Sequence, residues 1–449
     1  MSMATPITLA RRVRIYTAVS FVFLSLLVAG FLAPSAQAAF GIAEFKGSVL
    51  DETSTPFTRA GGHPFAATST IRFNTRDDVM GGLSADEQLK DSVVEMPPGF
   101  VGNPMAVPRC PNGLITNPEF VNGAISQCPA NSQVGVADIF LGSTIEAPFD
   151  HRIVPVYNLI PTEDQPARFA FNALGVIATA RIELRTGGDY GLTVAFRDTT
   201  QSAQLRRVAL TFWGVPADPA HDAERGQNCI AGPLFCVIPG GASAGVARAP
   251  FLTLPADCSA GPMSTIVHAN SWSDPSDVHT ASFDTDADHG DAPMAVTGCE
   301  NVPFTPDIDL QPTTSQADSP TGIDVDFSIP QQGLENPDGL ASAHLKRAEV
   351  TLPEGMSVNP ASADGLGACS PAEIGLDNAS SPSCPPASKI GSVEVETPLL
   401  DEPLDGAVYL AQQGTNPFQS LLALYLVAEG SLRAGRDAGQ LADQSPGQV

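Results

Sequence analysis

The chain has 449 residues, with 49 acidic side chains against 23 Lys and Arg, so its formal net charge is −26. This charge excludes proteins that bind nucleic acid or anionic membrane surfaces through clustered basic side chains. The 40 Pro exclude long helices, and a 43% hydrophobic content with only 16% charged residues excludes simple disorder. Short strands joined by turns rich in Pro and Gly are therefore expected, as in all-β sandwiches.

The first 38 residues have the pattern of a signal peptide. Three arginines within residues 11–14 precede the apolar run Ala18–Leu32, and the small-x-small sequence Ala-Gln-Ala follows at 36–38. The apolar run is short for a membrane span of about 20 residues, and a retained membrane anchor is the alternative. No later stretch is apolar enough to span a bilayer. We therefore expect a secreted or cell-surface protein that begins near Ala39.

Eight cysteines follow the predicted signal peptide, and their even number in an exported chain indicates four disulfides. Spacing alone does not fix the connectivity. Pairing of nearest neighbours is the simplest scheme, with bridges Cys110–Cys128, Cys229–Cys236, Cys258–Cys299 and Cys369–Cys384. The chain has no CxxC sequence, so neither a thioredoxin-like redox site nor a zinc ribbon is supported.

One stretch of sequence occurs twice, as CPANSQVG at 128–135 and as CPPASKIG at 384–391. Upstream, STIRF at 69–73 is matched by IDVDF at 323–327. Apolar and acidic residues alternate in IDVDF, as in a half-buried strand. In each copy a disulfide would close a loop just before a strand. We therefore interpret the duplicated stretch as a structural loop that is closed by a disulfide and leads into a strand, here called a stapled corner, and not as a chemical site.

The duplication predicts two β-sandwich modules, at 39–187 and 306–430. The range 188–305 has no second copy, and its strand-like sequences YGLTVAF and VALTFWGVP predict a separate β-rich domain. We expect the second copy to be truncated, because a polar, non-periodic sequence at 431–449 stands where the first copy continues with strands. That sequence is predicted to be a disordered tail. The expected fold class is all-β, with tandem immunoglobulin-like β-sandwich modules stapled by disulfides.

Several motifs, in this order, resemble large exported repeat proteins of certain actinobacteria. The motifs are PVYNLIP at 155–161, RTGGDYGLTV at 185–194, FWGVPADPAHD at 212–222, PFLTLPADC at 250–258 and SPTGIDVDF at 319–327. The resemblance spans nearly the whole mature chain and implies relatives that continue the second unit further. It implies no established activity, cofactor or site residue.

Residues 241–245 (Gly-Ala-Ser-Ala-Gly) fit the GxSxG pattern of a serine hydrolase, and Asp257 and His268 would complete a triad with Ser243. The pattern works only on a sharp turn from a buried strand into a helix. Pro239-Gly240 precedes it and Pro250 follows soon after, so neither flank fits. We expect a loop of small residues and no catalytic residue.

Asp284, Asp286, Asp288 and Asp291 alternate along the chain as the oxygen ligands of a calcium loop do. The glycine falls one position late for an EF-hand, and Ala295 stands where the final Glu would be. A solvated acidic loop is the alternative. Calcium at these four residues is the only cofactor that the sequence suggests.

Trp213 and Trp272, with Phe212 and Tyr190, are candidates for a carbohydrate-stacking platform, although strand tryptophans more often anchor a sandwich core. The pair His221-Asp222 is a candidate for acid–base work, but a polar turn explains it as well.

The predicted function is that of a non-enzymatic structural or adhesive repeat protein, secreted or attached to the surface of a bacterial cell envelope. A cell-wall polymer or a surface protein is the expected partner. The alternative is a secreted hydrolase or carbohydrate-binding protein that uses the range 188–305. A hydrolase would show one deep polar pocket within that range, whereas a spacer would not.

Overall fold

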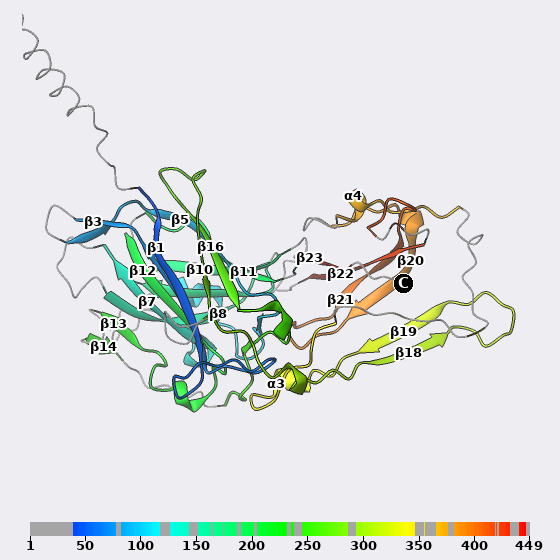
Figure 1. Cartoon of the computed structure of the whole chain (residues 1–449), viewed down its shortest axis with the longest axis horizontal. Coiled ribbons are helices and arrows are strands. Elements are labelled where there is room, and N and C mark those ends of the chain that lie inside the picture. The colour runs from blue at the N-terminus through cyan, green and yellow to red at the C-terminus, as the bar shows by residue number, and fades with distance from the viewer. Residues whose placement is uncertain are drawn as a thin grey trace, which may run out of the picture. The chain divides into compact units, whose positions relative to one another are not determined.

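A computed structural model describes most of the chain beyond residue 38. The described residues are 39–77, 82–116, 126–142, 151–162, 165–173, 175–185, 189, 191–201, 204–230, 235–237, 245–285, 293–345, 354, 365–375, 381–417, 419, 422–431 and 440–445. They are predominantly β, as predicted (Figure 1). The predicted signal peptide, residues 1–38, lies outside them.

Thirteen strands form the largest sheet, and all but two of them lie on one hydrogen-bonded path. The path follows the order β1-β2-β12-β7-β8-β9-β10-β11-β5-β16-β17, and all neighbours are antiparallel. In chain order the strands are β1 (Ile42–Leu50), β2 (Ala66–Phe73), β5 (Leu89–Glu95), β7 (Gln133–Leu141), β8 (His151–Leu159), β9 (Arg168–Ala173), β10 (Val176–Leu184), β11 (Leu192–Phe196), β12 (Leu205–Trp213), β16 (Ser264–Ser271) and β17 (His279–Asp284). Off the path, β13 (Asn228–Ile230) pairs with β8 and with β14 (Phe235–Val237).

The predicted boundary at 187/188 does not separate two sheets. Strands β11, β12, β16 and β17 come from the range 188–305, yet β12 lies between β2 and β7, and β11 lies between β10 and β5. The reason is local, because β10 and β11 form a hairpin across the boundary, with Ile182 opposite Val194. The unbroken path also differs from the predicted immunoglobulin-like sandwich, whose seven to nine strands divide between two sheets.

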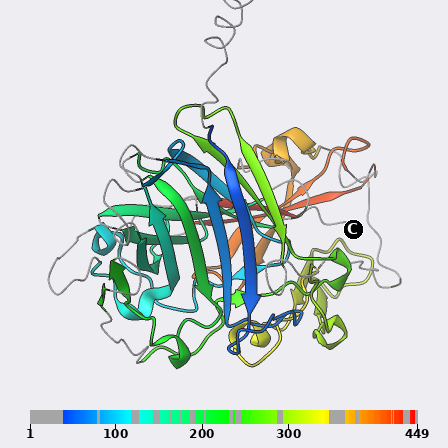
Figure 2. The same ribbon diagram turned by 60° about the vertical axis from the view of Figure 1, so that its left-hand side comes forward.

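The two ends of this path approach each other through side chains. Phe45 of β1 lies against Phe283 of β17, with ring centroids 4.8 Å apart, and Phe40 lies against His279 at 5.4 Å. In Figure 2 the blue strand β1 runs beside the green β16–β17 hairpin. The sheet therefore curls around an apolar interior, to which inward residues such as Ile139, Val154 and Phe169 contribute.

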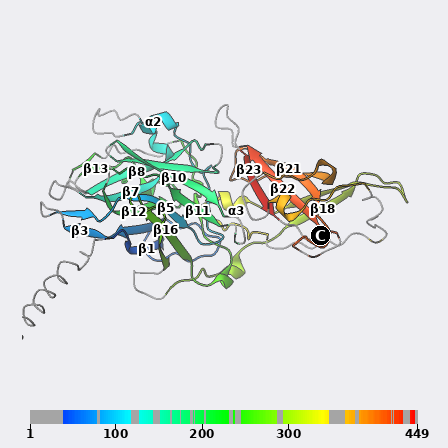
Figure 3. The ribbon, with the colours of Figure 1, turned by 90° about the horizontal axis from the view of Figure 1, so that it is seen from above.

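Short elements connect the strands. Two small sheets pair β3 (Thr75–Asp77) with β4 (Leu83–Ala85) and β6 (Val101–Gly102) with β15 (Leu252–Thr253). The helix α2 (Asn112–Thr116) lies on the β8–β9 side of the sheet, as Figure 3 shows, and Asn172 Nδ2 donates a hydrogen bond to its Ile115 carbonyl at 2.9 Å. The 3-10 turns here are η2 (Ala130–Ser132), η3 (Pro219–His221), η5 (Cys258–Ala260) and η6 (Cys299–Asn301).

Two further sheets follow in the chain. One pairs β18 (Asp307–Pro312) with β19 (Ile323–Ser328), and the other has the order β20 (Lys389–Val395), β21 (Leu404–Leu410), β22 (Leu424–Ser431) and β23 (Gln440–Ser445). Short helices α3 (Gln332–Glu335) and α4 (Pro371–Ile374) and the turn η8 (Pro386–Ser388) accompany them. Strand β23 falls in the range 431–449, which is predicted to be a disordered tail, and it pairs with β22 instead.

Three of the predicted disulfides are present, namely Cys110–Cys128, Cys258–Cys299 and Cys369–Cys384. Cys229 is also disulfide-bonded, and Cys236 stands opposite it in the β13–β14 hairpin, although the Cys236 side chain lies outside the described residues. Disulfides of this number indicate an oxidising, extracellular setting. Within the described part of the chain, no helix has the length and hydropathy needed to cross a membrane.

The first stapled corner is held to β8 by backbone hydrogen bonds. The Cys110 N–H donates to the Asn158 carbonyl at 2.7 Å, and the Ile160 N–H donates to the Cys110 carbonyl at 3.2 Å. After Cys128, the second cysteine of the bridge, the Ser132 hydroxyl donates to the Pro129 carbonyl at 2.7 Å, just before β7 begins. The corner thus sets the start of a strand.

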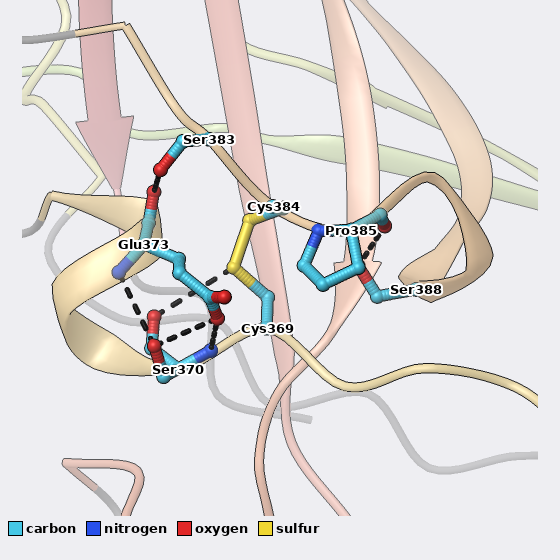
Figure 4. Close-up of a disulfide and its surroundings, with 7 residues drawn as sticks. All are labelled: Cys369, Ser370, Glu373, Ser383, Cys384, Pro385 and Ser388. Carbon is cyan, nitrogen blue, oxygen red and sulfur yellow. Dashed lines mark hydrogen bonds between the residues drawn. A yellow bond between two sulfur atoms is a disulfide. The ribbon is translucent and has the colours of Figure 1, made fainter.

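The second stapled corner makes the same bonds. The Cys369 N–H donates to the Leu410 carbonyl at 2.8 Å, and the Gln412 N–H donates to the Cys369 carbonyl at 2.8 Å. The Ser388 hydroxyl donates to the Pro385 carbonyl at 2.6 Å before β20 begins (Figure 4). The described parts of the two corners therefore share these hydrogen bonds, as expected if they do the same structural work.

Between its two cysteines the second corner carries a capped helix turn (Figure 4). The Ser370 N–H and hydroxyl both donate to Glu373 Oε2, at 2.8 and 2.7 Å, and the Glu373 N–H donates to Ser370 Oγ at 3.3 Å. This capping box satisfies donors at the start of α4. The hydrogen bonds from Ser370 lower the pKa of Glu373.

Both corners lead into strands whose register shifts at a glycine. The shift falls between Gln133 and Gly135 in β7 and between Lys389 and Gly391 in β20. A Cβ at Gly135 would lie 1.9 Å from the Thr211 carbonyl oxygen of β12. Glycine is therefore required at this position by the close approach of β12, since Gly135 is not in the positive-φ region.

Gly135→Ala is expected to lower the free energy of unfolding. The loss should reach or exceed the roughly 1–3 kcal/mol that overpacking costs, because the new methyl group would meet the Thr211 backbone and not a movable side chain. Urea denaturation followed by circular dichroism measures this. Gly102→Ala is the matched control, because its Cβ would meet its nearest neighbour at 4.0 Å. Equal stability of the two variants would contradict the close approach.

Candidate functional site

The curled sheet lines a partly open cavity of about 320 Å³. Its walls come from strands on both sides of residue 188, including β2, β7 and β9 from one range and β11, β12 and β16 from the other. The cavity volume is at the lower end of the roughly 300–1,000 Å³ that small-molecule sites have. It is the strongest candidate for a functional site in the described residues.

Alternation along two strands explains the apolar wall. On β11, Thr193 and Ala195 are buried on one face, whereas Leu192, Val194 and Phe196 point to the cavity from the other face. The cavity-facing side chains are only half-buried, although they face the interior of the sheet. A filled protein core leaves few voids larger than a water molecule, so this wall is underpacked.

The same pattern holds on β12, which supplies Val208, Leu210 and Phe212 to the cavity, all half-buried. Phe212 packs edge-on against Phe169, with centroids 5.4 Å apart, and Phe169 packs edge-on against Phe251 at the same distance. These aromatic contacts give one end of the cavity a rigid apolar wall.

The charged groups at the cavity are already paired with neighbours. Arg197 donates to Glu183 at 2.9 Å, and Asp198 lies 2.9 Å from Lys90 Nζ. The other lining residues are apolar or carry hydroxyls, such as Thr285, which donates to the Met263 carbonyl at 3.1 Å. Among the described lining residues there is no His, Cys, Glu or Lys. The arrangement can hold an uncharged apolar group, and it offers no nucleophile with an adjacent base.

The structure does not assemble the predicted hydrolase triad from the residues it describes. His268 lies on β16 with Nδ1 3.0 Å from Thr280 Oγ1 and Nε2 3.2 Å from Glu95 Oε1, so both ring nitrogens have partners other than Asp257. Asp257 instead accepts from the Ser259 N–H at 2.8 Å, as the cap of η5. Ser243 lies outside the described residues.

The calcium prediction is only partly covered by the structure. Asp284 is the exposed last residue of β17, while Asp286, Asp288 and Asp291 lie outside the described residues. Elsewhere in the described ranges, no group of three or more His, Cys, Asp or Glu side chains is placed to hold a metal ion. Calcium at the four aspartates therefore stays a prediction.

The aromatic residues considered for a carbohydrate platform lie in different places. Trp213 is buried, Phe212 faces the cavity, and Tyr190 lies outside the described residues. Trp272 Nε1 donates to the Thr199 carbonyl at 2.8 Å, and Lys90 Nζ lies 5.1 Å from the Trp272 ring centroid. Trp213 therefore anchors the core, which is the usual role of strand tryptophans.

His221 and Asp222 belong to a packed cluster at the end of β12. The His221 ring is stacked against Trp213 at 4.5 Å and against Phe65 at 4.2 Å. Buried Arg225 donates from Nε to Asp222 Oδ1 at 2.8 Å. Burial lowers the pKa of His221 to about 4. The His221-Asp222 pair therefore contributes to packing, because the imidazole lies between the Trp213 and Phe65 rings.

No family model, curated protein or solved structure matches this chain. The cavity is therefore the feature that bears on function. Sequence reasoning missed this site, because alternating apolar residues on strands predict an inward face but not whether that face is filled.

Acidification is expected to destabilise the protein through His221. Its folded-state pKa of about 4 lies below the ordinary histidine pKa of 6.5, so the unfolded chain binds more protons between these two pH values. The contribution is complete above pH 6.5 and is lost as the pH falls towards 4, at about 1.4 kcal/mol for each unit of pKa.

His221→Phe keeps an aromatic ring in the stack and removes the titratable imidazole. The unfolding free energy of this variant is therefore expected to change less between pH 6.5 and 4.5 than that of the wild type. Urea denaturation at each pH measures both. Identical pH dependence of the two proteins would contradict the burial of a neutral His221.

Proposed function

We propose that the chain is an exported, non-enzymatic protein of a bacterial cell envelope, and that its largest sheet binds an apolar molecule. The observation that carries the ligand class is the partly open cavity of about 320 Å³ with an apolar wall. Disulfides support the compartment, and the predicted signal peptide at 1–38 agrees with it. The modules act as spacers or binding units that carry this site outside the cytoplasm.

The tandem organisation is part of the proposal. Two stapled corners with the same hydrogen bonds, at Cys110–Cys128 and Cys369–Cys384, support duplicated β modules. In the first module the sheet also uses strands from 188–305. The resemblance of the sequence to exported repeat proteins of actinobacteria is consistent with this organisation and adds no activity to it.

The alternative is a glycan-binding protein or hydrolase that uses the range 188–305. Such a site needs several convergent hydrogen-bonding groups, because sugars carry a hydroxyl on most carbons. The described cavity crosses that range and presents mostly aliphatic and aromatic side chains. An apolar ligand therefore fits better than a sugar.

Titration with cis-parinaric acid, a fluorescent fatty acid, is expected to show saturable binding, whereas soluble oligosaccharides should neither bind nor be cleaved. Val208→Trp is expected to weaken fatty-acid binding by about tenfold or more, because the indole would fill the cavity. Val194→Phe, on another wall, provides a second cavity-filling variant.

Arg207→Trp is the matched control, one residue away on β12. The Arg207 guanidinium lies 5.1 Å from the Phe140 ring and 3.7 Å from Asp138 Oδ2, on the face away from the cavity. This control should bind like the wild type, and circular dichroism should show that all the variants are folded. Unchanged affinity in both filled variants would refute the cavity as the site.

A further inference from the structure

The wall of the cavity contains a junction that is not held by a ladder of backbone hydrogen bonds. The hydrogen-bonded path of the largest sheet begins at β1 and ends at β17, and in the described residues no ladder joins these two strands. They nevertheless lie side by side (Figure 2), and the Phe45 and Phe283 rings meet with centroids 4.8 Å apart. This junction between residues 42–50 and 279–284 is called the seam below.

The number of strands disfavours a ladder at the seam. The path has eleven strands and each is antiparallel to the next, so the first and the last, β1 and β17, run in the same direction. Closing the sheet here would need a parallel pair, which is slightly less stable per residue than an antiparallel pair. The sheet therefore curls without the full hydrogen-bonded closure of a barrel.

Side chains close the seam in place of a ladder. Phe283 lies over Gly47 of β1, where a Cβ would be 2.4 Å from the tip of the phenyl ring. Phe45 packs edge-on against Phe283, with an interplanar angle of 62°. Nearer the start of β1, Phe40 packs edge-on against His279 at 5.4 Å. Parting β1 from β17 therefore disrupts ring contacts, whereas parting any other neighbours on the path breaks backbone hydrogen bonds as well.

The seam leads from solvent to the cavity. On its inner side, Phe45 and Val49 of β1 and Phe283 of β17 line the cavity. The outward side chains at the seam are polar and reach the solvent, namely Lys46, Thr280, Ser282 and Asp284. A gap between the two strands would therefore connect water directly with the apolar interior.

The two ends of the curled sheet are less suited to the passage of an apolar molecule. At one end, just beyond β12, the N–H groups of Phe251 and Leu252 donate to the Gly214 carbonyl at 2.6 and 3.1 Å, and both side chains are buried. Strand β11 runs opposite to β12, so the residues after it lie at the other end. There Arg197 and Asp198 line the cavity with charged groups. Aromatic rings border the seam instead.

We propose that the seam is the entrance to the cavity, and that an apolar chain passes sideways between β1 and β17 when Phe45 and Phe283 move apart. This inference rests on the proposed function, because it assigns the route by which the ligand of that site enters. The rings then act as a gate that sets the rate of exchange.

A cross-link across the seam tests the proposal. In the full chain with Lys46→Cys and Ser282→Cys, the two thiols would flank the seam on its outer face, beside Gly47 and Phe283. The described residues contain no free cysteine that would compete. A short bis-maleimide is expected to join the two thiols, which intact mass measures, because the strands lie side by side.

Binding of cis-parinaric acid to the cross-linked chain is followed by stopped-flow fluorescence. The on-rate and the off-rate are both expected to fall about tenfold or more, with little change in Kd, because a locked entrance alters neither the free nor the bound state. A cross-link that merely reshaped the cavity would change Kd.

Two matched controls separate the seam from general effects of the chemistry. The same variant capped with N-ethylmaleimide leaves the seam unlocked and should exchange ligand like the wild type. Glu44→Cys with Arg72→Cys places the same cross-link on the other edge of β1, where Glu44 and Arg72 stand opposite each other in the ladder with β2. That cross-link should leave both rates unchanged.

Failure of the bis-maleimide to join the thiols, or wild-type rates after it has joined them, would overturn the proposal while fatty-acid binding itself remained. Equal slowing by both cross-links would also overturn it, because the effect would then not belong to the seam. Absence of saturable binding to the wild type would instead refute the cavity as the site, and the entrance with it.

Discussion

The simultaneous pairing of β12 with β2 and β7 is the interaction on which the largest sheet depends. It connects the β1–β2 hairpin to the strands that follow the first stapled corner. It also draws the range 188–305 into the same sheet as the earlier residues. The cost of leaving two strand edges unpaired explains why such a distant segment is inserted between them.

The same strand shapes the candidate site. The side chains of β12 that face inward, Val208, Leu210 and Phe212, form part of the cavity wall, while its outward Arg207 lies near Asp138. A sheet with this many strands encloses more space than its inward side chains fill. The half-buried state of these apolar residues shows the shortfall in packing, which a bound apolar ligand would relieve.

Local features were predictable from the sequence, and strand order was not. Alternating residues identified the strands, and the simplest scheme, pairing of nearest-neighbour cysteines, predicted three bridges now seen at Cys110–Cys128, Cys258–Cys299 and Cys369–Cys384. The division at 187/188 does not separate the strands of the largest sheet, because periodicity reports which face of a strand is buried but not which strand lies beside it. The cavity was missed for a related reason, since Leu210 or Val194 has the same pattern whether it meets another side chain or a void.

Native-state amide hydrogen exchange tests most directly whether pairing with β12 is what protects the edge of β7. Strand β7, residues 133–141, is expected to be protected almost to the level of global unfolding, whereas in β20, residues 389–395, the amides not bonded to β21 are expected to exchange orders of magnitude faster. Equal protection of the two strands in the isolated chain would contradict this role of β12, because β20 would then already have a neighbour on both sides.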